Sequence, residues 1–285
     1  MVQEMTSSRP TLPDFIIMGA MKAGTTTLYH YLSDHPEIGM SEEKETDFFI
    51  EEKNYRRGLD WYLNQFKPGF SCYGEASPNY AKARDFRGVP ERIIHAIPHC
   101  KFIYLVRDPI ERFISHYNHA YLTGGNVPDP DKLYRQHEWF HMIDSSLYHR
   151  QLTEYLKYTS LDSILVVEFE GFVRSPKSSL KEITDFLGVS ERQNWEWKKT
   201  ANSSKELARI PQWLLKLRRR REVAGMLRRL PKPFVQTLRS KAANGRPREL
   251  PVLDSALRAR IADAVADDAE QLRVLTGQHF EAWSV

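Results

Sequence analysis

Cysteine is scarce in this sequence, and long apolar runs are missing from it. The chain of 285 residues has only two cysteines, Cys72 and Cys100, too few for a disulfide framework, so two reduced core thiols are expected. No run of about eighteen apolar residues occurs, which argues against a membrane-spanning helix. Residues 1–13 are polar and lack the apolar core of a signal peptide, so a cytoplasmic location is expected.

Clusters of metal-binding residues are also missing. Among the ten histidines, His137 and His141 stand four residues apart, as metal-binding pairs on helices do. Neither an HExxH pattern nor a cysteine cluster accompanies them. The sequence therefore predicts no metal site.

Positive charge is unevenly distributed along the chain. Residues 205–248 contain fourteen Lys or Arg against two Glu, whereas the whole chain has a formal net charge of +4. No nucleic-acid-binding motif accompanies this basic segment, so a nucleic-acid partner is not expected. The segment is predicted to be helical. It forms either a solvated basic face or, through residues 213–232, a peripheral contact with an acidic or membrane surface.

The most informative segment comprises residues 14–28. An apolar run from Phe15 to Met18 ends at Gly19, a loop through Lys22 follows, and three threonines come directly after Gly24. This pattern predicts a strand, a turn and the start of a helix. The unpaired N–H groups and the dipole at such a helix start attract anions, so the segment is predicted to bind a phosphate.

The spacing of the two glycines is close to that of a Walker A loop, G-x-x-x-x-G-K-[ST], but the lysine is displaced. Thr25 occupies the position of the Walker lysine, and Lys22 lies within the loop instead. The lysine therefore precedes the second glycine, whereas the Walker lysine follows it. It approaches the ligand differently, which disfavours ordinary kinase or NTPase chemistry. A tight turn with an incidental lysine is the alternative interpretation.

A second candidate anion site follows another buried strand. Residues 102–106 are continuously apolar or aromatic, as in parallel strands that are covered on both faces. Arg107 comes at the carboxyl end of this strand, Pro109 suits a first helical turn, and Ser115 lies two turns further on. A guanidinium at this edge suits a phosphate, although pairing of Arg107 with Asp108 would also explain it.

Both segments resemble the sulfotransferases that use 3′-phosphoadenosine 5′-phosphosulfate (PAPS), most closely the Golgi heparan-sulfate type and its bacterial relatives. The K-x-G-T-T loop of that family is matched at residues 22–26, and its R-D-P-x-x-R-x-x-S motif at residues 107–115. The resemblance implies that Arg107 and Ser115 bind the 3′-phosphate of PAPS. It assigns the 5′-phosphosulfate to the loop and the helix start: Lys22, Ala23, Gly24, Thr25, Thr26 and Thr27. A bacterial enzyme without a membrane anchor is expected.

The same resemblance implies the catalytic base. The family's K/N-E-x-x-F-F segment is matched by residues 44–49, so Glu45 is the expected base for the acceptor hydroxyl. Phe48 and Phe49 match the aromatic pair that packs beneath it. A solvent-facing acidic stretch is the alternative interpretation, and a histidine is the chief rival base.

One segment departs from the family pattern. Residues 74–80 resemble its E-K-S/T-x-x-Y-F stretch, but Ala76 stands where those enzymes carry a second lysine near the transferred group. Either Lys22 alone offsets the negative charge that builds on the oxygen between phosphorus and sulfur of the 5′-phosphosulfate, or another cation such as Lys82 or Arg84 takes the place of the second lysine.

The alternation of apolar runs and helical periodicity predicts an α/β protein with a P-loop-like, three-layer fold, in which helices flank a central parallel sheet. Strands are expected at 14–18, around 71–75, 101–106 and 163–168, and helices at 25–33, 88–97, 109–121, 146–158 and 176–187. The chain length favours a single domain, 1–285. Its expected parts are a core with the binding motifs (14–188), the basic segment (205–248) and a C-terminal helix (250–285).

The expected reaction is in-line transfer of a sulfuryl group from PAPS to an acceptor hydroxyl, with 3′-phosphoadenosine 5′-phosphate (PAP) as product and without a metal. The acceptor is expected to be a carbohydrate, a lipid or another natural product. Two alternatives stay open: a small-molecule kinase with a degenerate P-loop, and a nucleotide- or anion-binding module without catalysis. The oligomeric state is not predicted.

Overall fold

The computed structural model describes residues 12–123, 127–192, 194–195, 208–211, 247 and 249–285. Most of the basic segment 205–248, including all of 213–232, lies outside the described residues. Within the described ranges, no helix has both the length and the apolar character needed to cross a membrane.

Parallel strands form one five-stranded sheet with the order β2-β3-β1-β4-β5. The strands span Phe15–Gly19 (β1), Ile38–Met40 (β2), Cys72–Ala76 (β3), Lys101–Val106 (β4) and Ile164–Glu168 (β5). The predicted apolar runs correspond to β1, β3, β4 and β5. Strand β2 was missed, because three residues carry too little pattern to separate a strand from a loop.

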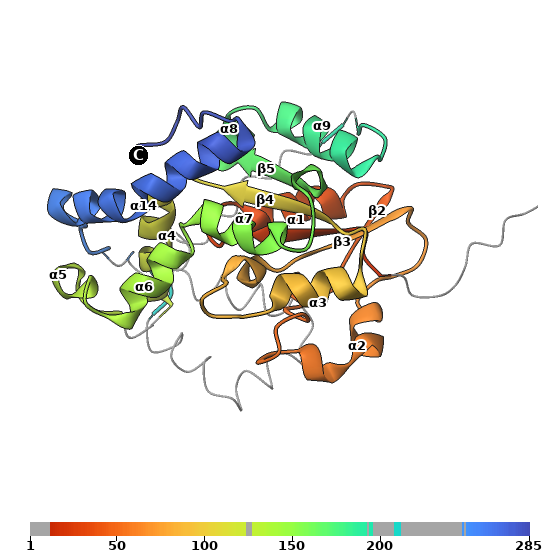
Figure 1. Cartoon of the computed structure of the whole chain (residues 1–285), viewed down its shortest axis with the longest axis horizontal. Coiled ribbons are helices and arrows are strands. Elements are labelled where there is room, and N and C mark those ends of the chain that lie inside the picture. Colours follow the sequence, from red (N-terminus) through yellow and green to blue (C-terminus); the bar gives the residue numbers. More distant parts are fainter. Residues whose placement is uncertain (1–11, 124–126, 193, 196–207, 212–246, 248) are drawn as a thin grey trace, which may run out of the picture.

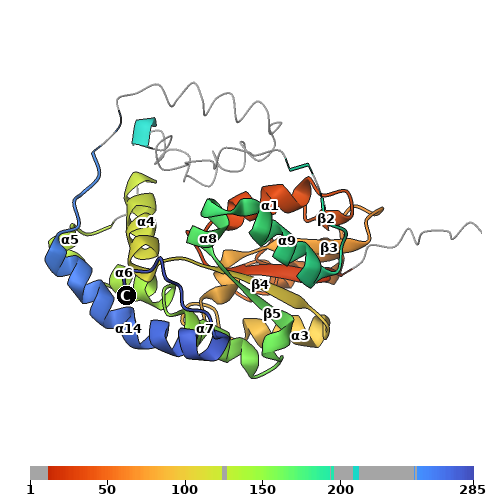
Figure 2. The same ribbon diagram turned by 90° about the horizontal axis from the view of Figure 1, so that it is seen from above.

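Helices cover both faces of the sheet (Figure 1). Their bounds are Thr25–Ser33 (α1), Leu59–Leu63 (α2), Val89–Ala96 (α3), Pro109–Leu122 (α4), Pro130–Leu133 (α5), His137–Asp144 (α6), Tyr148–Leu156 (α7), Phe169–Arg174 (α8), Pro176–Leu187 (α9) and Ser255–Thr276 (α14). Short 3-10 helices in the described ranges are Tyr55–Arg57 (η1), Pro78–Ala81 (η2) and Leu161–Ser163 (η3). Figure 2 shows α1, α8 and α9 on one face of the sheet and α3 and α7 on the other, which confirms the predicted α/β three-layer fold.

The predicted helices correspond to α1, α3, α4, α7 and α9, with ends that differ by at most two residues. The sequence did not reveal α2, α5, α6 and α8. None of these is longer than eight residues. Helices this short are not stable alone, and their positions depend on tertiary packing more than on local pattern.

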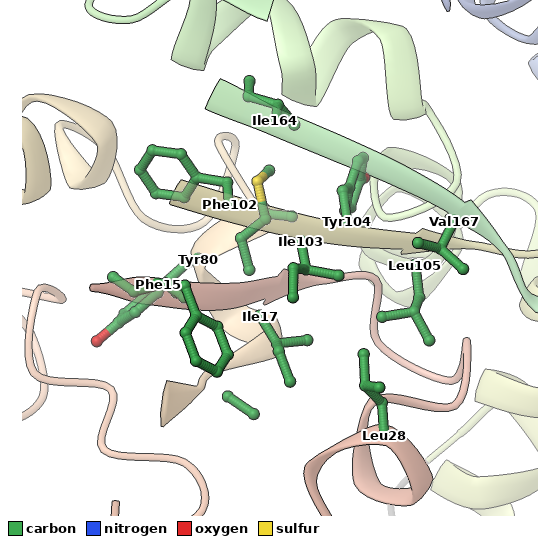
Figure 3. Close-up of a cluster of buried hydrophobic side chains, with 14 of the residues drawn as sticks. Phe15, Ile17, Leu28, Tyr80, Phe102, Ile103, Tyr104, Leu105, Ile164 and Val167 are labelled. Atoms are coloured by element: carbon green, nitrogen blue, oxygen red, sulfur yellow. The ribbon is translucent and has the colours of Figure 1, made fainter. Parts of the chain in front are cut away.

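The core lies on both faces of the central strands. Every residue of β1 and all but the first of β4 are buried, as their continuous apolar sequences predict. Figure 3 shows side chains of β1, β4 and β5 packed with Leu28 of α1 and Tyr80 of η2. Cys72 and Cys100 are free and buried, which agrees with the expected reduced core thiols.

The C-terminal helix α14 and the residues after it pack against the part of the fold that follows β4. Helix α14 contacts α4, α6 and α7. A second apolar cluster joins α14 to α4 and α6 and includes Phe113, Trp139, Leu257, Ile261 and Val265. The helix ends before Gly277, and the chain then returns toward the sheet, where the Ser284 N–H and hydroxyl both donate to Asp108 Oδ2 at 2.6 Å.

Candidate active site

The predicted site residues follow the carboxyl ends of different strands, and parallel pairing places all these ends at one edge of the sheet. Lys22 lies in the loop after β1, and Arg107 follows β4. Glu45 lies in the loop after β2, and η2 follows β3. Because β3, β1 and β4 are neighbours, these segments meet although they are far apart in the sequence.

The loop between β1 and α1 has a backbone that suits few residues. Gly24, the N-cap of α1, has φ +92°, and Lys22 has φ +73°. A Cβ at Gly24 would come 2.7 Å from the ring of Phe169, so the position requires glycine for both conformation and space. The first turn of α1 contains no acidic residue, and no described side chain caps it. The Thr27 N–H donates to the Gly24 carbonyl oxygen at 2.9 Å, so the N–H groups of Thr25 and Thr26 are the ones suited to an anionic ligand.

Gly19, the other glycine of the near-Walker pattern, has a packing role. A Cβ there would lie 2.8 Å from Ala81 Cβ and 2.9 Å from the ring of Tyr104. Glycine thus allows η2 to approach the end of β1. The two glycines serve different purposes, since one admits a neighbouring element and the other admits the loop conformation.

Lys22 is surrounded mainly by positive charge. Its pKa is lowered to about 8, first by burial and then by the charges of Arg107 and Arg112. The carboxylate of Glu45 acts in the opposite direction and therefore lies within electrostatic reach of the ammonium. Arg107 Nη1 also donates to the Lys22 carbonyl oxygen at 3.4 Å. The structure thus brings Lys22, Arg107 and Glu45 together at a site that an anion would neutralise.

Arg107 is partly buried, and its guanidinium lies over the ring of Phe169, 5.1 Å from the centroid. Its Nε makes no hydrogen bond to the described residues. Carboxylate oxygens of Glu111 and Glu170 are each 4.0 Å from guanidinium nitrogens, too far for hydrogen bonds. Donors of Arg107 are therefore available to a phosphate.

The sequence left open that Asp108 is the counter-ion of Arg107, but in the structure Asp108 has a different role. Its carboxylate caps α4 and accepts hydrogen bonds from the N–H groups of Ile110 (2.8 Å) and Glu111 (3.0 Å). Ser115 lies on α4, partly exposed, two turns after the cap. Its assignment to the 3′-phosphate stays a prediction.

Glu45 is half-exposed, with 49% of its side chain accessible, and its carboxylate lies 2.7 Å from Lys44 Nζ. The two aromatic residues after it, Phe48 and Phe49, are buried and pack edge to face, with 5.0 Å between their centroids. The segment is therefore solvent-facing at Glu45 and anchored in the core at the phenylalanines. The role of Glu45 as base stays a prediction.

A buried carboxylate anchors the loop that carries Glu45. Glu75 of β3 is fully buried, and burial raises its pKa. Its oxygens accept hydrogen bonds from the hydroxyl groups of Thr46, Tyr62 (2.7 Å), Ser77 (2.8 Å) and Tyr80 (3.1 Å). These donors oppose the rise of the pKa. Because Thr46 directly follows Glu45, the network holds the candidate base in place relative to the sheet.

Arg112 and His116 form a buried pair next to the loop between β1 and α1, and the sequence did not predict it. Arg112 is fully buried, and its guanidinium donates to the carbonyl oxygens of Met21 (3.3 Å) and Met142 (2.5 Å) and to Ser146 Oγ (2.6 Å). Nδ1 of His116 lies 3.2 Å from Arg112 Nη1. Burial, followed by the charge of Arg112, lowers the pKa of His116 well below its usual value. The second arginine of the R-D-P-x-x-R-x-x-S motif was the available signal.

Two cations are candidates to substitute for the lysine that Ala76 replaces. Lys82 is buried, and its Nζ lies 3.2 Å from Sδ of Met21, the residue before Lys22. Arg84 is exposed, and its guanidinium lies 5.0 Å from the ring centroid of Phe140. Lys82 is therefore the better placed of the two, because it contacts the anion-binding loop.

His137 and His141 are the two histidines that are spaced as in metal-binding pairs. In the structure, His141 contacts a carboxylate instead: its Nδ1 lies 2.6 Å from Asp85 Oδ2. Within the part of the chain that the structure describes, no group of three or more His, Cys, Asp or Glu side chains could hold a metal ion. A reaction without metal stays a prediction.

Comparison with known proteins gives relatives in several organisms. Mouse (Mus musculus) heparan sulfate glucosamine 3-O-sulfotransferase 3B1 is 30% identical over 187 residues, which cover 62% of this chain and 46% of the relative. Human (Homo sapiens) bifunctional heparan sulfate N-deacetylase/N-sulfotransferase 2 is 27% identical over 216 residues, covering 68% of this chain and 24% of the relative. The chain thus spans less than half the length of either relative.

Among solved structures, a sulfotransferase from Alicyclobacillus acidocaldarius matches with a TM-score of 0.66 at 23% identity, covering 96% of this chain and 100% of that chain. At this identity the likeness concerns the fold. A family model described as the sulfotransferase domain matches residues 12–209, a range that contains Lys22, Glu45, Arg107 and Ser115. Since this match covers well over half of the sequence, the chain belongs to the sulfotransferase domain family.

Proposed function

We propose that this chain transfers a sulfuryl group from PAPS to an acceptor hydroxyl. The observation that carries the proposal is the meeting of Lys22, Arg107 and the first turn of α1 at one sheet edge. A lysine whose pKa is lowered to about 8, a guanidinium with available donors and a helix N-terminus together suit a ligand with several negative charges. PAPS has such charges on its 5′-phosphosulfate and on its 3′-phosphate.

In the proposed reaction the acceptor oxygen attacks sulfur and forms a new O–S bond. The bond between sulfur and the bridging oxygen of the 5′-phosphosulfate breaks, and its electron pair stays with PAP. The hydroxyl proton passes to the Glu45 carboxylate. Lys22 stabilises the charge on the bridging oxygen, and Arg107 and Ser115 bind the 3′-phosphate. The N–H groups of Gly24, Thr25 and Thr26 bind the 5′-phosphosulfate, because those of Ala23 and Thr27 already donate to the carbonyl oxygens of Ala20 (3.1 Å) and Gly24 (2.9 Å).

Glu45 is a better base than the buried histidine nearest to the loop. An arginine N–H is always a donor, so Nδ1 of His116 accepts from Arg112, and the ring proton is on Nε2. The only lone pair of the neutral imidazole is then occupied. Glu45 is half-exposed and within electrostatic reach of Lys22, which suits contact with an acceptor that arrives from solvent.

Carbohydrates are the first acceptors to test. The mouse and human relatives are named for sulfation of heparan sulfate, a polysaccharide. Next to Phe48 lie Tyr55, which is 42% exposed, and Trp61, whose ring has the Arg57 guanidinium 3.9 Å from its centroid. Such amphipathic aromatic and cationic surfaces suit sugar rings with acidic groups. Lipid and other natural-product hydroxyls are the next classes.

The donor is tested by thermal unfolding with and without PAP. A ligand at a hundred times its Kd adds about 2.7 kcal/mol to the free energy of unfolding, so a clear rise in Tm is expected. No shift at saturating PAP would rule out the donor assignment. If PAP binds, [³⁵S]PAPS is supplied with unsulfated heparan-type polysaccharide and simple glycosides. We expect Lys22→Ala and Glu45→Gln to abolish transfer, whereas an active Glu45→Gln variant would indicate a histidine base.

Activity measurements with different substrates separate this proposal from its two alternatives, a small-molecule kinase and a binding module without catalysis. A kinase with a degenerate P-loop would turn over ATP with Mg²⁺, whereas the proposed sulfuryl transfer continues in the presence of a chelator. A binding module without catalysis would bind PAP but release no PAP from PAPS. A cytoplasmic location and a bacterial source are part of the proposal, and cell fractionation followed by immunoblotting tests the location.

A further inference from the structure

Lys82 is a buried cation without a counter-ion among the described residues. It follows η2 directly, and only 4% of the residue is accessible to solvent. Its one hydrogen bond within the described ranges is to Met21 Sδ, at 3.2 Å, and no described carboxylate lies within ion-pair distance. A thioether is a weak acceptor and cannot satisfy an ammonium group.

The position of Lys82 follows from the packing of η2. Ala81 packs against Gly19 at the end of β1, and β1 and η2 are in extensive contact. On the other side, Asn79 Nδ2 donates to the carboxylate of Asp47, at 3.1 and 3.0 Å, two residues after Glu45. The segment that carries Lys82 therefore contacts both the loop of the donor site and the loop of the candidate base.

A cation in this position reduces the stability of the fold. Burial lowers the pKa of Lys82 to about 8, Asp85 opposes this effect, and the charges of Arg112 and Lys53 reinforce it. Asp47 also favours the charged form, but neither carboxylate makes an ion pair with Lys82. Costly buried charges without partners are typical of functional sites, where activity is obtained at the expense of stability.

We propose that Lys82 supplies a second cation to the transfer site and contacts the oxygens of the sulfuryl group during transfer. This inference rests on the proposed function. Ala76 contributes only a methyl group to β3, so any second positive charge must come from another residue. Met21 covers the Lys82 ammonium through a flexible, unbranched side chain, and a sulfuryl oxygen is a far better acceptor than its sulfur.

The test uses PAP and PAPS as separate probes, because only PAPS has the sulfuryl group. We expect Lys82→Met to bind PAP within about twofold of the wild type, since 3′-phosphate and loop contacts are unchanged. We expect the same variant to release sulfate from PAPS, with water as acceptor, about a hundredfold more slowly. Lys82→Arg keeps the charge and should recover part of the rate.

Thermal unfolding distinguishes a functional lysine from a structural one. Removal of an unpaired buried charge should raise the Tm of Lys82→Met. Lys101→Met is the matched control, because Lys101 lies at the opposite end of the sheet, where its Nζ donates to the Phe186 carbonyl oxygen at 2.6 Å. This control should lose stability and keep the wild-type rate of sulfate release.

Two outcomes would overturn the inference while leaving the proposed function intact. One is a Lys82→Met variant that keeps the wild-type rate of sulfate release although Lys22→Ala is inactive. The other is a lower Tm together with weakened PAP binding, which would make Lys82 a structural residue. Failure of the wild-type chain to bind PAP would instead reject the donor, and with it both proposals.

Discussion

Gly24 and Lys22 show how single residues define the donor site. Gly24 has a left-handed backbone (φ +92°), and its missing Cβ leaves room for Phe169, whose ring also supports Arg107. Because Gly24 has no side chain, Phe169 can contact both the loop after β1 and Arg107 at the end of β4. Lys22 is held among like charges, so the site without a ligand is electrostatically unfavourable and a bound anion relieves the repulsion.

We expect Gly24→Ala to weaken PAP binding by about tenfold or more, because the loop must move to relieve a contact of 2.7 Å with the Phe169 ring. The left-handed backbone alone costs about 1–2 kcal/mol of stability with a Cβ present. Gly188→Ala is the control: Gly188 has φ +77°, but an added methyl group there would meet no atom within 4 Å among the described residues. That variant should lose stability and keep its PAP affinity, as isothermal titration can show.

The lowered pKa of Lys22 predicts a pH dependence. The charged form is the active one, so kcat/KM for PAPS should fall as the pH rises through about 8, where the free site loses its ammonium charge. Bound PAPS favours the charged form, and kcat should therefore persist to higher pH. Lys22→Arg keeps its charge, so only the ionisation of Lys82, whose pKa burial also lowers to about 8, should remain, and the alkaline limb should become less steep. A kcat/KM profile that stays flat to about pH 9.5 would contradict this role.

At the scale of elements, the C-terminal residues support the helix that follows β4. Asp108 Oδ1 caps α4, while Asp108 Oδ2 accepts both hydrogen bonds from Ser284. Arg107 precedes this cap directly. The residues after α14 thus brace the turn that presents the guanidinium, although they lie far from it in the sequence.

Asp108→Ala should lower the free energy of unfolding by about 2 kcal/mol, because both the helix cap and the partner of Ser284 are lost. PAP affinity should fall as well, since the change is adjacent to Arg107. Asp254→Ala is the matched control, because it removes the cap of α14. In this cap the Leu257 N–H donates to Asp254 Oδ1 at 2.8 Å. Denaturant unfolding should show a loss of about 1 kcal/mol for the control, with unchanged PAP binding.

At the scale of the whole molecule, charge is divided between two regions. The segment 205–248 has fourteen basic and two acidic residues, and the remainder of the chain is net negative. We propose that residues 213–232, which lie outside the described residues, contact anionic surfaces such as lipid headgroups. Attraction of this kind contributes about 1 kcal/mol per basic residue near the surface and weakens with salt.

Sedimentation with phosphatidylserine-containing vesicles tests this contact. Changing Arg219 and Arg220 to Gln should reduce vesicle binding by about thirtyfold at low salt. The control replaces Lys177 and Lys181 with Gln, an equal change in charge at exposed positions of α9. Equal losses in both variants would indicate a non-specific charge effect. No binding by the wild-type chain would leave a solvated basic face as the interpretation of the segment.

The sequence predicted the local parts of the fold because their patterns are local. A strand, a glycine loop and a helix start follow one another within residues 15–33, and a second strand, turn and helix without a glycine span 101–122. Continuous apolar runs reveal strands that are covered on both faces, and a proline at 109 marks a helix start. Family resemblance then connected Lys22, Arg107 and Ser115 to one ligand before any geometry was known.

Only the tertiary structure decided which residues from distant segments meet. The strand order β2-β3-β1-β4-β5 brings Lys82 to Met21 and Phe169 between Gly24 and Arg107. The packing of α14 brings Ser284 to Asp108. These contacts join residues that are separated by more than fifty positions, and no periodic pattern encodes them. The burial of Lys82 away from any counter-ion among the described residues likewise depends on packing, because a lysine in a sequence carries no sign of its surroundings.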